Sequence, residues 1–287
     1  MPAREAVIVD TLRTPVGKRK GALAGWHPTD LLGHTLRSLV DRHDVDPGLV
    51  DDVVGGCVTQ AGEQGCNVTR NAWVAAGLPW HVPATSVDRQ CGSSQQAVHF
   101  VAQGVIAGAY DLAIACGVES MTRSPMSSNA RGGIGPFSPA FLEVCNGVLG
   151  IQFWVAQVLA DKFGVTRQEM DEFAVESHRR AAANTDSGWF ADELVPVPIR
   201  DADGVETGDL LTADEGIRRN TDRSVLAALP PAWESDDQPA PDITAGNSSQ
   251  MSDGASAMLI AERSTAERLG LPIRARFAHF AVLADDP

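Results

Sequence analysis

The feature that most constrains the fold of this 287-residue sequence is a regular alternation of short apolar runs and amphipathic segments in its first 120 residues. Short apolar runs predict strands, and apolar residues at helical spacing predict helices. We expect strands at residues 5–10, 53–58, 84–87 and 111–117, and helices at 30–41, 68–76 and 95–109. Strand–helix alternation with short connections is typical of an α/β fold, in which helices cover the faces of a mixed or parallel sheet.

The pattern changes at Met121, where a stretch rich in Ser, Gly and Pro predicts a connecting loop. A helical segment follows at 150–163, and Thr166 with Glu169 has the spacing of a capping box that opens a helix running to about residue 185. Residues 193–199 contain two prolines, which predicts an edge strand. This part of the chain therefore forms a second region, outside the first alternation.

The last part of the sequence begins after residues 230–241, which have the composition of a linker. Residues 255–261 predict a strand, and Ser264 with Glu267 predicts a capping box for a short helix ending at Gly270. Residues 273–283 predict the start of one more strand.

Charge and hydropathy exclude several classes of partner. The formal net charge of −14 argues against nucleic-acid or anionic-membrane binding, because phosphate groups would meet a repulsive field. Residues 1–15 lack the apolar core of a signal peptide, which predicts a cytoplasmic protein. The most apolar long window, residues 144–160, is interrupted by polar side chains, and it predicts a buried segment rather than a membrane span.

The five cysteines do not predict a disulfide framework, since their number is odd and no export signal precedes them. No pair has the two-residue spacing of a zinc site, and no histidine follows at ligand spacing. We expect no metal site.

Cys91, in the stretch SVDRQCGSSQQAVHF, lies between a predicted strand and a predicted helix. Unpaired N–H groups and the helix macrodipole favour a thiolate at such a position. Gly92, Ser93 and Ser94 keep the turn small, which leaves room for a substrate carbonyl. The pattern fits a nucleophile, and it also fits a small buried cysteine at a helix start, the commoner role of a free cysteine.

Three ordered blocks of sequence resemble the thiolases, acyltransferases that cleave or form carbon–carbon bonds in coenzyme A thioesters. They are AVIVDTLRTPVGKRKGAL, DRQCGSSQQAVHFVAQGVIAGAYDLAIACGVESMTRSPM and ITAGNSSQMSDGASAMLIAE. The resemblance implies a layered fold, a mixed five-stranded sheet covered by helices, with an inserted loop domain. It predicts an N-terminal domain at residues 1–120, the loop domain at 121–245, a return to the N-terminal domain at 246–272, and the first strand of a truncated C-terminal repeat at 273–287.

The resemblance assigns Cys91 as the nucleophile that receives the acyl group, with its own backbone N–H as one oxyanion donor. Asp88 stands where many family members have Asn, which adds a negative charge that partly opposes thiolate formation. None of the seven histidines stands in the Gly-His-Pro context of the family's activating histidine, and His99 lies about 12 Å along the helix axis, too far to replace it.

The predicted function is acyl transfer by a thiolase-type enzyme, to coenzyme A in thiolysis or to acetyl-CoA in Claisen condensation. The resemblance implies that Ser249 contacts the pantetheine arm and that Arg218 lies near the adenine. It also implies a homodimer or homotetramer, with coenzyme A as a substrate rather than a permanently bound cofactor. Two alternatives stay open: a catalytically incomplete chain that binds coenzyme A or a partner chain, and a decarboxylating condensing enzyme related to the ketoacyl synthases.

Overall fold

The computed structural model describes residues 4–147, 149–233 and 240–284, which fold as two compact units. The described residues of Met1–Asn129, Ala191–Glu215 and Met251–Val282 form unit 1. Those of Ala130–Phe190, Gly216–Gln250 and Leu283–Pro287 form unit 2. Of the expected linker at 230–241, residues 234–239 lie outside the described part of the chain. The division into family domains stays a prediction.

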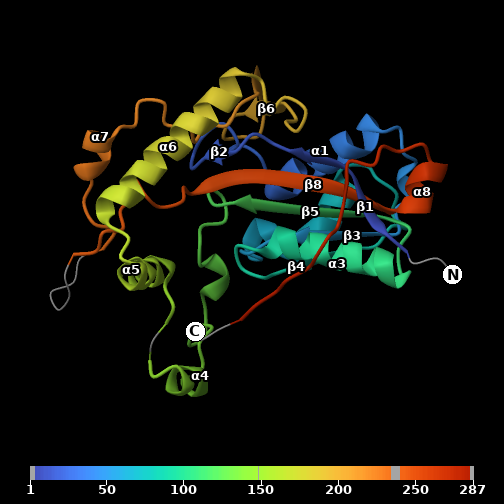
Figure 1. The fold of residues 1–287 in the computed structure, drawn as a ribbon. Coiled ribbons are helices and arrows are strands. Elements are labelled where there is room, and N and C mark those ends of the chain that lie inside the picture. The colour runs from blue at the N-terminus through green and yellow to red at the C-terminus, as the bar shows by residue number, and fades with distance from the viewer. Residues whose placement is uncertain (1–3, 148, 234–239, 285–287) are drawn as a thin grey trace. The chain divides into compact units, whose positions relative to one another are not determined.

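Unit 1 is built on one mixed sheet, which confirms the expected α/β fold class (Figure 1). Its strands run in the order β4 (Ala84–Val87), β3 (Asp52–Gly56), β5 (Leu112–Ser120), β8 (Ser252–Glu262), β1 (Ala6–Arg13) and β9 (Ala275–Arg276), and β2 (Gly17–Lys18) also pairs with β8. The pairs β3–β4 and β3–β5 are parallel, and the pairs of β8 with β5 and β1 are antiparallel. The strands expected at 5–10, 53–58, 84–87, 111–117 and 255–261 are therefore present, together with the two-residue strands β2 and β9.

Helices cover both faces of this sheet. On one face lie α1 (Pro28–Arg42) and α2 (Val68–Ala75), and on the other lies α3 (Ser93–Ala107). The alternation of side chains along each strand divides the core: Val53 and Leu259 belong to the cluster under α1 and α2, whereas their neighbours Val54 and Ile260 belong to the cluster under α3. Along the chain, α3 follows β4, and the turn between these two elements contains Cys91.

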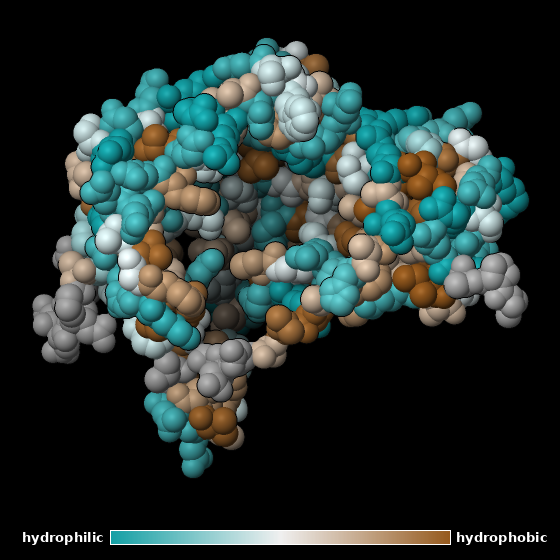
Figure 2. Space-filling view, in the orientation of Figure 1, coloured by the Kyte–Doolittle hydropathy of each residue, from teal (hydrophilic) through white to brown (hydrophobic). Residues whose placement is uncertain are grey.

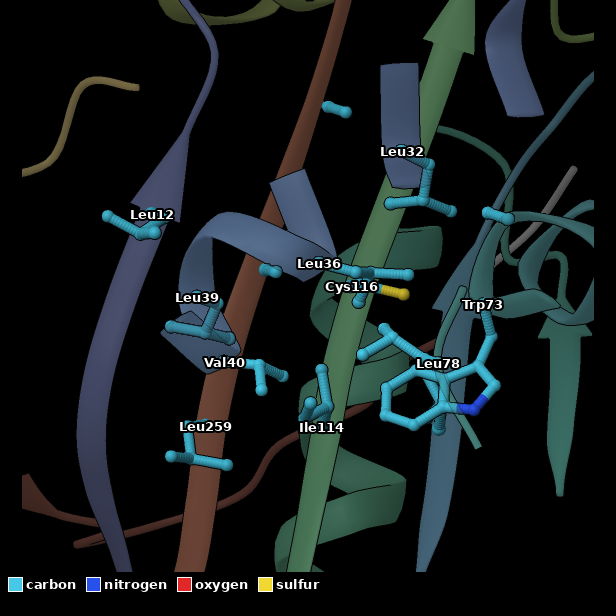
Figure 3. Packing of buried hydrophobic residues seen from close by; sticks show 14 of the residues in the cluster. Leu12, Leu32, Leu36, Leu39, Val40, Trp73, Leu78, Ile114, Cys116 and Leu259 are labelled. Atoms are coloured by element: carbon cyan, nitrogen blue, oxygen red, sulfur yellow. The ribbon is translucent and has the colours of Figure 1, made fainter. Parts of the chain in front are cut away.

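The core under α1 shows why the sequence pattern holds. Leu32, Leu36 and Leu39 point from one face of α1 toward β5 and β8 (Figure 3). Trp73 lies beside Leu78 in the same buried cluster (Figure 3). Each such buried side chain contributes about 1.5–3 kcal/mol of burial free energy. The helix begins after His27, whose side chain accepts a hydrogen bond from Thr29 N–H, and Pro28 occupies its first turn, where no backbone donor is needed.

Two predictions for the last part of unit 1 are wrong. The short helix α8 (Arg263–Arg268) is capped by Glu262, whose carboxylate accepts from the N–H groups of Ser264 and Thr265, and not by a box of Ser264 and Glu267. The helix begins earlier than expected because β8 continues directly into it. The expected strand over 273–283 is reduced to the two residues of β9, which pair with β1, and among the described residues the rest of this segment has no strand partner.

Two short elements complete unit 1 next to the sheet. The expected edge strand at 193–199 is divided: Val195 N–H bonds to Arg13 C=O at the end of β1, and β6 (Val197–Arg200) forms a separate hairpin with β7 (Glu206–Leu211). Prolines at 196 and 198 leave few donors for a central position, which agrees with their place at an edge. Three short 3₁₀ segments also occur, at Pro47–Leu49, Gly62–Gln64 and Ser128–Ala130.

Unit 2 is helical, with α4 (Pro139–Val144), α5 (Gln152–Phe163), α6 (Arg167–Asp186) and α7 (Arg223–Ala227). The capping box of Thr166 and Glu169 is present with both of its hydrogen bonds. The predicted burial of 144–160 is wrong, because within α5 only Ala160 is buried and the large side chains of Phe153 and Trp154 are exposed. Apolar composition indicates that a segment favours burial, but the described neighbours of α5 do not cover its apolar side chains.

The surface of the chain is mixed in character. Figure 2 shows hydrophobic residues reaching the surface at several places among hydrophilic ones. Within the described residues, no helix combines the length and the apolar character required to cross a bilayer.

Candidate active site

Cys91 lies in the turn between β4 and α3, and its side chain is exposed to solvent just before the start of α3. β4 ends at Val87, α3 begins at Ser93, and Gly92 is the N-cap residue. Cys91 is exposed and forms no disulfide. Of the two interpretations of the sequence pattern, a buried structural cysteine is therefore wrong, and the assignment of Cys91 as a nucleophile stays a prediction.

The turn is closed by hydrogen bonds on both sides of Cys91. The Ser93 hydroxyl accepts from Arg89 N–H at 2.9 Å and donates to Gln90 C=O at 2.6 Å. The Asp88 carboxylate accepts from Gln90 N–H at 2.7 Å, and Gly92 N–H donates to Arg89 C=O at 3.1 Å. Gln90 has a φ of 47°, a left-handed conformation that a residue with a side chain adopts only at a cost.

Two strand glycines let the first turn of α3 lie directly against the sheet. A Cβ on Gly56 of β3 would lie 2.2 Å from Ser94 N, and a Cβ on Gly117 of β5 would lie 2.0 Å from Ser94 Oγ. Neither position has room for a side chain. The strands therefore determine how far from the sheet the helix start, and with it Cys91, is held.

The electrostatic surroundings of the turn are acidic on the side of β3. Burial, together with the charges of Glu119 and Asp88, raises the pKa of the Cys57 thiol to about 12. Glu119 itself accepts from the N–H groups of Val58 and Thr59 and from the Gln64 amide. Cys57 is thus an inert thiol, and Asp88 places a negative charge near the turn, as the comparison of Asp88 with the usual Asn led us to expect.

No histidine assists Cys91 within the described part of the chain, where Cys91 has no histidine hydrogen-bond partner. His99 lies two turns further along α3, and its ring packs edge-on against Phe280 at 5.4 Å between centroids. This agrees with the expectation that His99 is too far away to act as the base.

A cleft of about 180 Å³ opens beside the first turn of α3 in unit 1. Ser94 and Val98 of α3 line one side, and residues of β1, β5 and β8 line the floor, among them Ala115 and Met258. Arg13 stands at the cleft, where it forms ion pairs with Glu193 and Asp214.

Ser249 and Arg218 both lie in unit 2, and the structure brings their two segments together. The side chain of Gln250, next to Ser249, donates to Gly216 C=O at 2.6 Å, two residues before Arg218. Both Ser249 and Arg218 are exposed. The backbone N–H of Arg218 donates to His178 Nδ1, and burial with the Arg218 charge lowers the pKa of His178.

The sequence analysis named Ser93 only for its small size and missed its hydrogen bonds, and it missed Gly56 and Gly117. Glycines within predicted strands were a visible signal, but their contacts with α3 are made between segments distant in the sequence. As to metals, the described residues contain no group of three or more His, Cys, Asp or Glu side chains placed to hold an ion.

Comparison with known proteins places this arrangement in a family. Residues 6–264 match the family model described as the N-terminal domain of thiolase. The chain is 41% identical to the steroid 3-ketoacyl-CoA thiolase of Mycobacterium tuberculosis, with 99% of the chain and 68% of that protein covered. It is 43% identical to a 3-ketoacyl-CoA thiolase of Erwinia tasmaniensis, with 99% of the chain and 71% of that protein covered.

A solved structure agrees with these matches. The acetyl-CoA acetyltransferase of Bacillus anthracis superposes with a TM-score of 0.81 at 31% identity, and the match covers 96% of this chain and 69% of that one. The mixed sheet with helices on both faces, the exposed cysteine at the start of α3 and the match over residues 6–264 together lead to one conclusion: the chain belongs to the thiolase family of acyltransferases.

Proposed function

We propose that this chain transfers acyl groups from coenzyme A thioesters through an acyl-cysteine intermediate at Cys91. The observation that carries the proposal is the placement of Cys91, an exposed thiol in a hydrogen-bonded turn immediately before the N-terminus of α3. The start of a helix places backbone N–H groups near an acyl group carried on this sulfur. The relatives named as 3-ketoacyl-CoA thiolases support the substrate class.

The first half-reaction moves an acyl group from the thioester substrate to Cys91. In thiolysis, Cys91 Sγ attacks the 3-keto carbon of the substrate and a carbon–sulfur bond forms. The bond between C2 and C3 then breaks, and its electron pair leaves with acetyl-CoA as a carbanion that takes up a proton. In the condensation direction, Sγ attacks the acetyl-CoA carbonyl and the coenzyme A thiolate leaves. Both routes lead to an acyl-cysteine, and both need a donor such as the Cys91 N–H at the developing oxyanion.

The second half-reaction transfers the acyl group from Cys91 to an acceptor. In thiolysis coenzyme A loses its thiol proton to water, the resulting thiolate attacks the acyl-cysteine carbonyl, and Cys91 leaves as a thiolate. In condensation a second acetyl-CoA loses a C2 proton to a base of the solvent, and the resulting carbanion attacks the same carbonyl, forms the new carbon–carbon bond and releases Cys91 as a thiolate. Among the described residues no histidine hydrogen-bonds to Cys91, and the feature next to its sulfur is the N-terminus of α3.

Coenzyme A binding is assigned in this proposal to the segments of unit 2 that meet at Gly216 and Gln250. Ser249 presents an exposed hydroxyl suited to the amides of the pantetheine arm, and Arg218 presents an exposed guanidinium suited to a phosphate. A homodimer or homotetramer is proposed for the assembled protein from the family resemblance.

The experiment that tests the proposal measures acylation of individual cysteines. The protein is incubated with acetyl-CoA or acetoacetyl-CoA, and intact mass followed by peptide mapping locates any acyl group. We expect one acyl group on Cys91 and one released thiol for each acyl group in the acetyl-CoA reaction. Cys66 provides the matched control because it is also exposed and free: Cys66→Ala should still acylate, and Cys91→Ala should not.

The alternatives give different results in the same experiment. An acyl group that never forms, in a protein that still binds coenzyme A, indicates a binding chain without acyl transfer. A stable adduct on Cys91 without turnover indicates a chain that performs only the first half-reaction. Acylation that persists in Cys91→Ala removes Cys91 from the mechanism.

A further inference from the structure

We propose that Ser93 is a positioning residue for acyl transfer, because its hydroxyl holds the turn that carries Cys91 in one conformation. The inference rests on the proposed role of Cys91 as the nucleophile. Ser93 is the first residue of α3 and is 3% exposed. Its hydroxyl is engaged as both acceptor and donor, with Arg89 N–H at 2.9 Å and Gln90 C=O at 2.6 Å.

These two bonds differ from ordinary helix capping. A capping side chain stands before the helix and accepts from N–H groups of its first turn. Here the N-cap is Gly92, which has no side chain to offer, and Ser93 bonds backward to residues that precede the helix. The hydroxyl therefore satisfies no donor of α3, and its bonds span Cys91 from one side of the turn to the other.

The backbone at Gln90 explains why the turn needs to be held. Its φ of 47° is left-handed, a conformation that is strained in a residue other than glycine because Cβ comes close to the backbone. Gln90 C=O accepts from both the hydroxyl and the N–H of Ser93, the latter at 3.0 Å. Without the hydroxyl, the relaxed conformation of Gln90 competes with the left-handed one, and Cys91, the next residue, moves with it.

The position of α3 is determined separately from that of the turn. Gly56 and Gly117 admit the first turn of the helix to the sheet, and Ser93 itself lies inside that contact. The helix start is thus fixed by packing, whereas residues 88–91 are exposed and depend on hydrogen bonds. Because water reaches the exposed turn and can replace the lost hydrogen bonds, loss of the hydroxyl should leave the protein folded, while the reacting sulfur loses its fixed location.

The test compares a reaction that demands geometry with one that does not. Acetyl-CoA must meet Cys91 Sγ in a fixed orientation, whereas iodoacetamide alkylates an accessible thiol without a binding site. We expect Ser93→Ala to slow acetylation of Cys91 by about ten- to a hundredfold and to leave alkylation near the wild-type rate. Ser93→Thr keeps the hydroxyl and should retain most of the acetylation rate.

Two further variants separate positioning from general destabilisation. Thr35→Val removes another buried hydroxyl of unit 1, one that donates to Leu31 C=O at 3.0 Å within α1, and it should acetylate as the wild type does. Gln90→Gly in the Ser93→Ala background should restore part of the rate, since glycine adopts a left-handed conformation without the Cβ penalty.

The outcomes are distinguishable. Provided that the wild type is acetylated on Cys91, three results overturn the positioning role and leave the proposed function standing. They are an unchanged acetylation rate in Ser93→Ala, an equal loss of acetylation rate in Thr35→Val, and a Ser93→Ala protein that does not fold while Thr35→Val does. A wild-type protein that is never acylated on Cys91 overturns the proposed function, and the role of Ser93 falls with it.

Discussion

At the scale of single residues, neighbouring side chains of the same type have different tasks because their partners differ. Arg219 is committed to Asp186 through two hydrogen bonds, at 2.9 and 2.8 Å. The guanidinium of Arg218 has no ion-pair partner among the described residues. Cysteines divide in the same way: Cys116 is buried, which raises the pKa of its thiol, whereas Cys91 is exposed.

The two arginines lead to a residue-scale prediction about coenzyme A. If Arg218 contacts a phosphate of the substrate, Arg218→Ala removes a charge-assisted bond and should weaken coenzyme A binding by about 1.5–3 kcal/mol. Arg219→Ala is the matched control, because its charge is already neutralised by Asp186, and it should bind as the wild type does. Isothermal titration of both variants measures the difference, and equal losses would count against the assignment of Arg218.

At the scale of elements, local sequence pattern determines where a helix or strand begins and ends, whereas long-range contacts determine how the elements pack. β4 has the bounds that its sequence predicts, and α6 begins at the expected capping box. Local signals suffice there, because hydrophobic spacing and capping involve residues within one or two turns. The approach of α3 to the sheet depends instead on Gly56 and Gly117, which are far from Ser94 in sequence, so no local pattern reveals it.

That approach leads to an element-scale prediction. Gly117→Ala places a Cβ 2.0 Å from Ser94 Oγ and 3.0 Å from Ser94 Cβ and Gly56 O, so the Ser94 side chain must rotate and the start of α3 must give way slightly. We expect a loss of about 1–3 kcal/mol of stability together with slower acylation of Cys91. Gly254→Ala in β8 is the control, since its nearest neighbour, Thr14 Oγ1, would lie at an ordinary 3.4 Å. Urea unfolding measures both variants.

A second substitution tests the cause of the loss. Ser94→Gly removes Oγ and Cβ of Ser94, two of the three atoms that the new methyl group would meet, and leaves Gly56 O, so the double variant with Gly117→Ala should recover part of the lost stability. A double variant whose losses simply add would show that the helix–sheet contact is not the reason.

At the scale of the whole molecule, Asp10 joins parts of unit 1 that are remote in sequence. Its carboxylate, fully buried in β1, meets His43 Nε2 at 2.7 Å at the end of α1 and Arg274 at 2.9 Å next to β9. Burial alone would raise the pKa of Asp10, but the hydrogen bond from His43 and the charge of Arg274 outweigh it, and the pKa is lowered.

This cluster predicts a pH dependence of stability. The folded-state pKa of Asp10 lies below the unfolded value of about 3.9, so its contribution is fully present above about pH 4 and is lost as the pH falls through the folded pKa. Asp10→Asn should cost about 1–3 kcal/mol at pH 7, because His43 loses a charge-assisted hydrogen bond and the partly exposed Arg274 and Arg42 lose an ion-pair partner. It should also flatten the loss of stability below about pH 4.

Urea unfolding at neutral and acidic pH measures this effect. Asp41→Asn is the control, because its pair with Arg37 is on the surface of α1 and should contribute less than about 1 kcal/mol. A stability of Asp10→Asn that falls as steeply with acid as that of the wild type would contradict the role given to Asp10.

The sequence by itself determined the alternation of strands and helices, the apolar face of α1, and the position of Cys91 between β4 and α3, because each of these depends on spacing within a short segment. Only the tertiary structure decided which way Ser93 bonds, how closely α3 approaches the sheet, that α5 exposes the apolar residues expected to be buried, and that residues 273–283 supply two strand residues instead of a full strand. These features depend on which distant segments become neighbours, and local spacing carries no information about that.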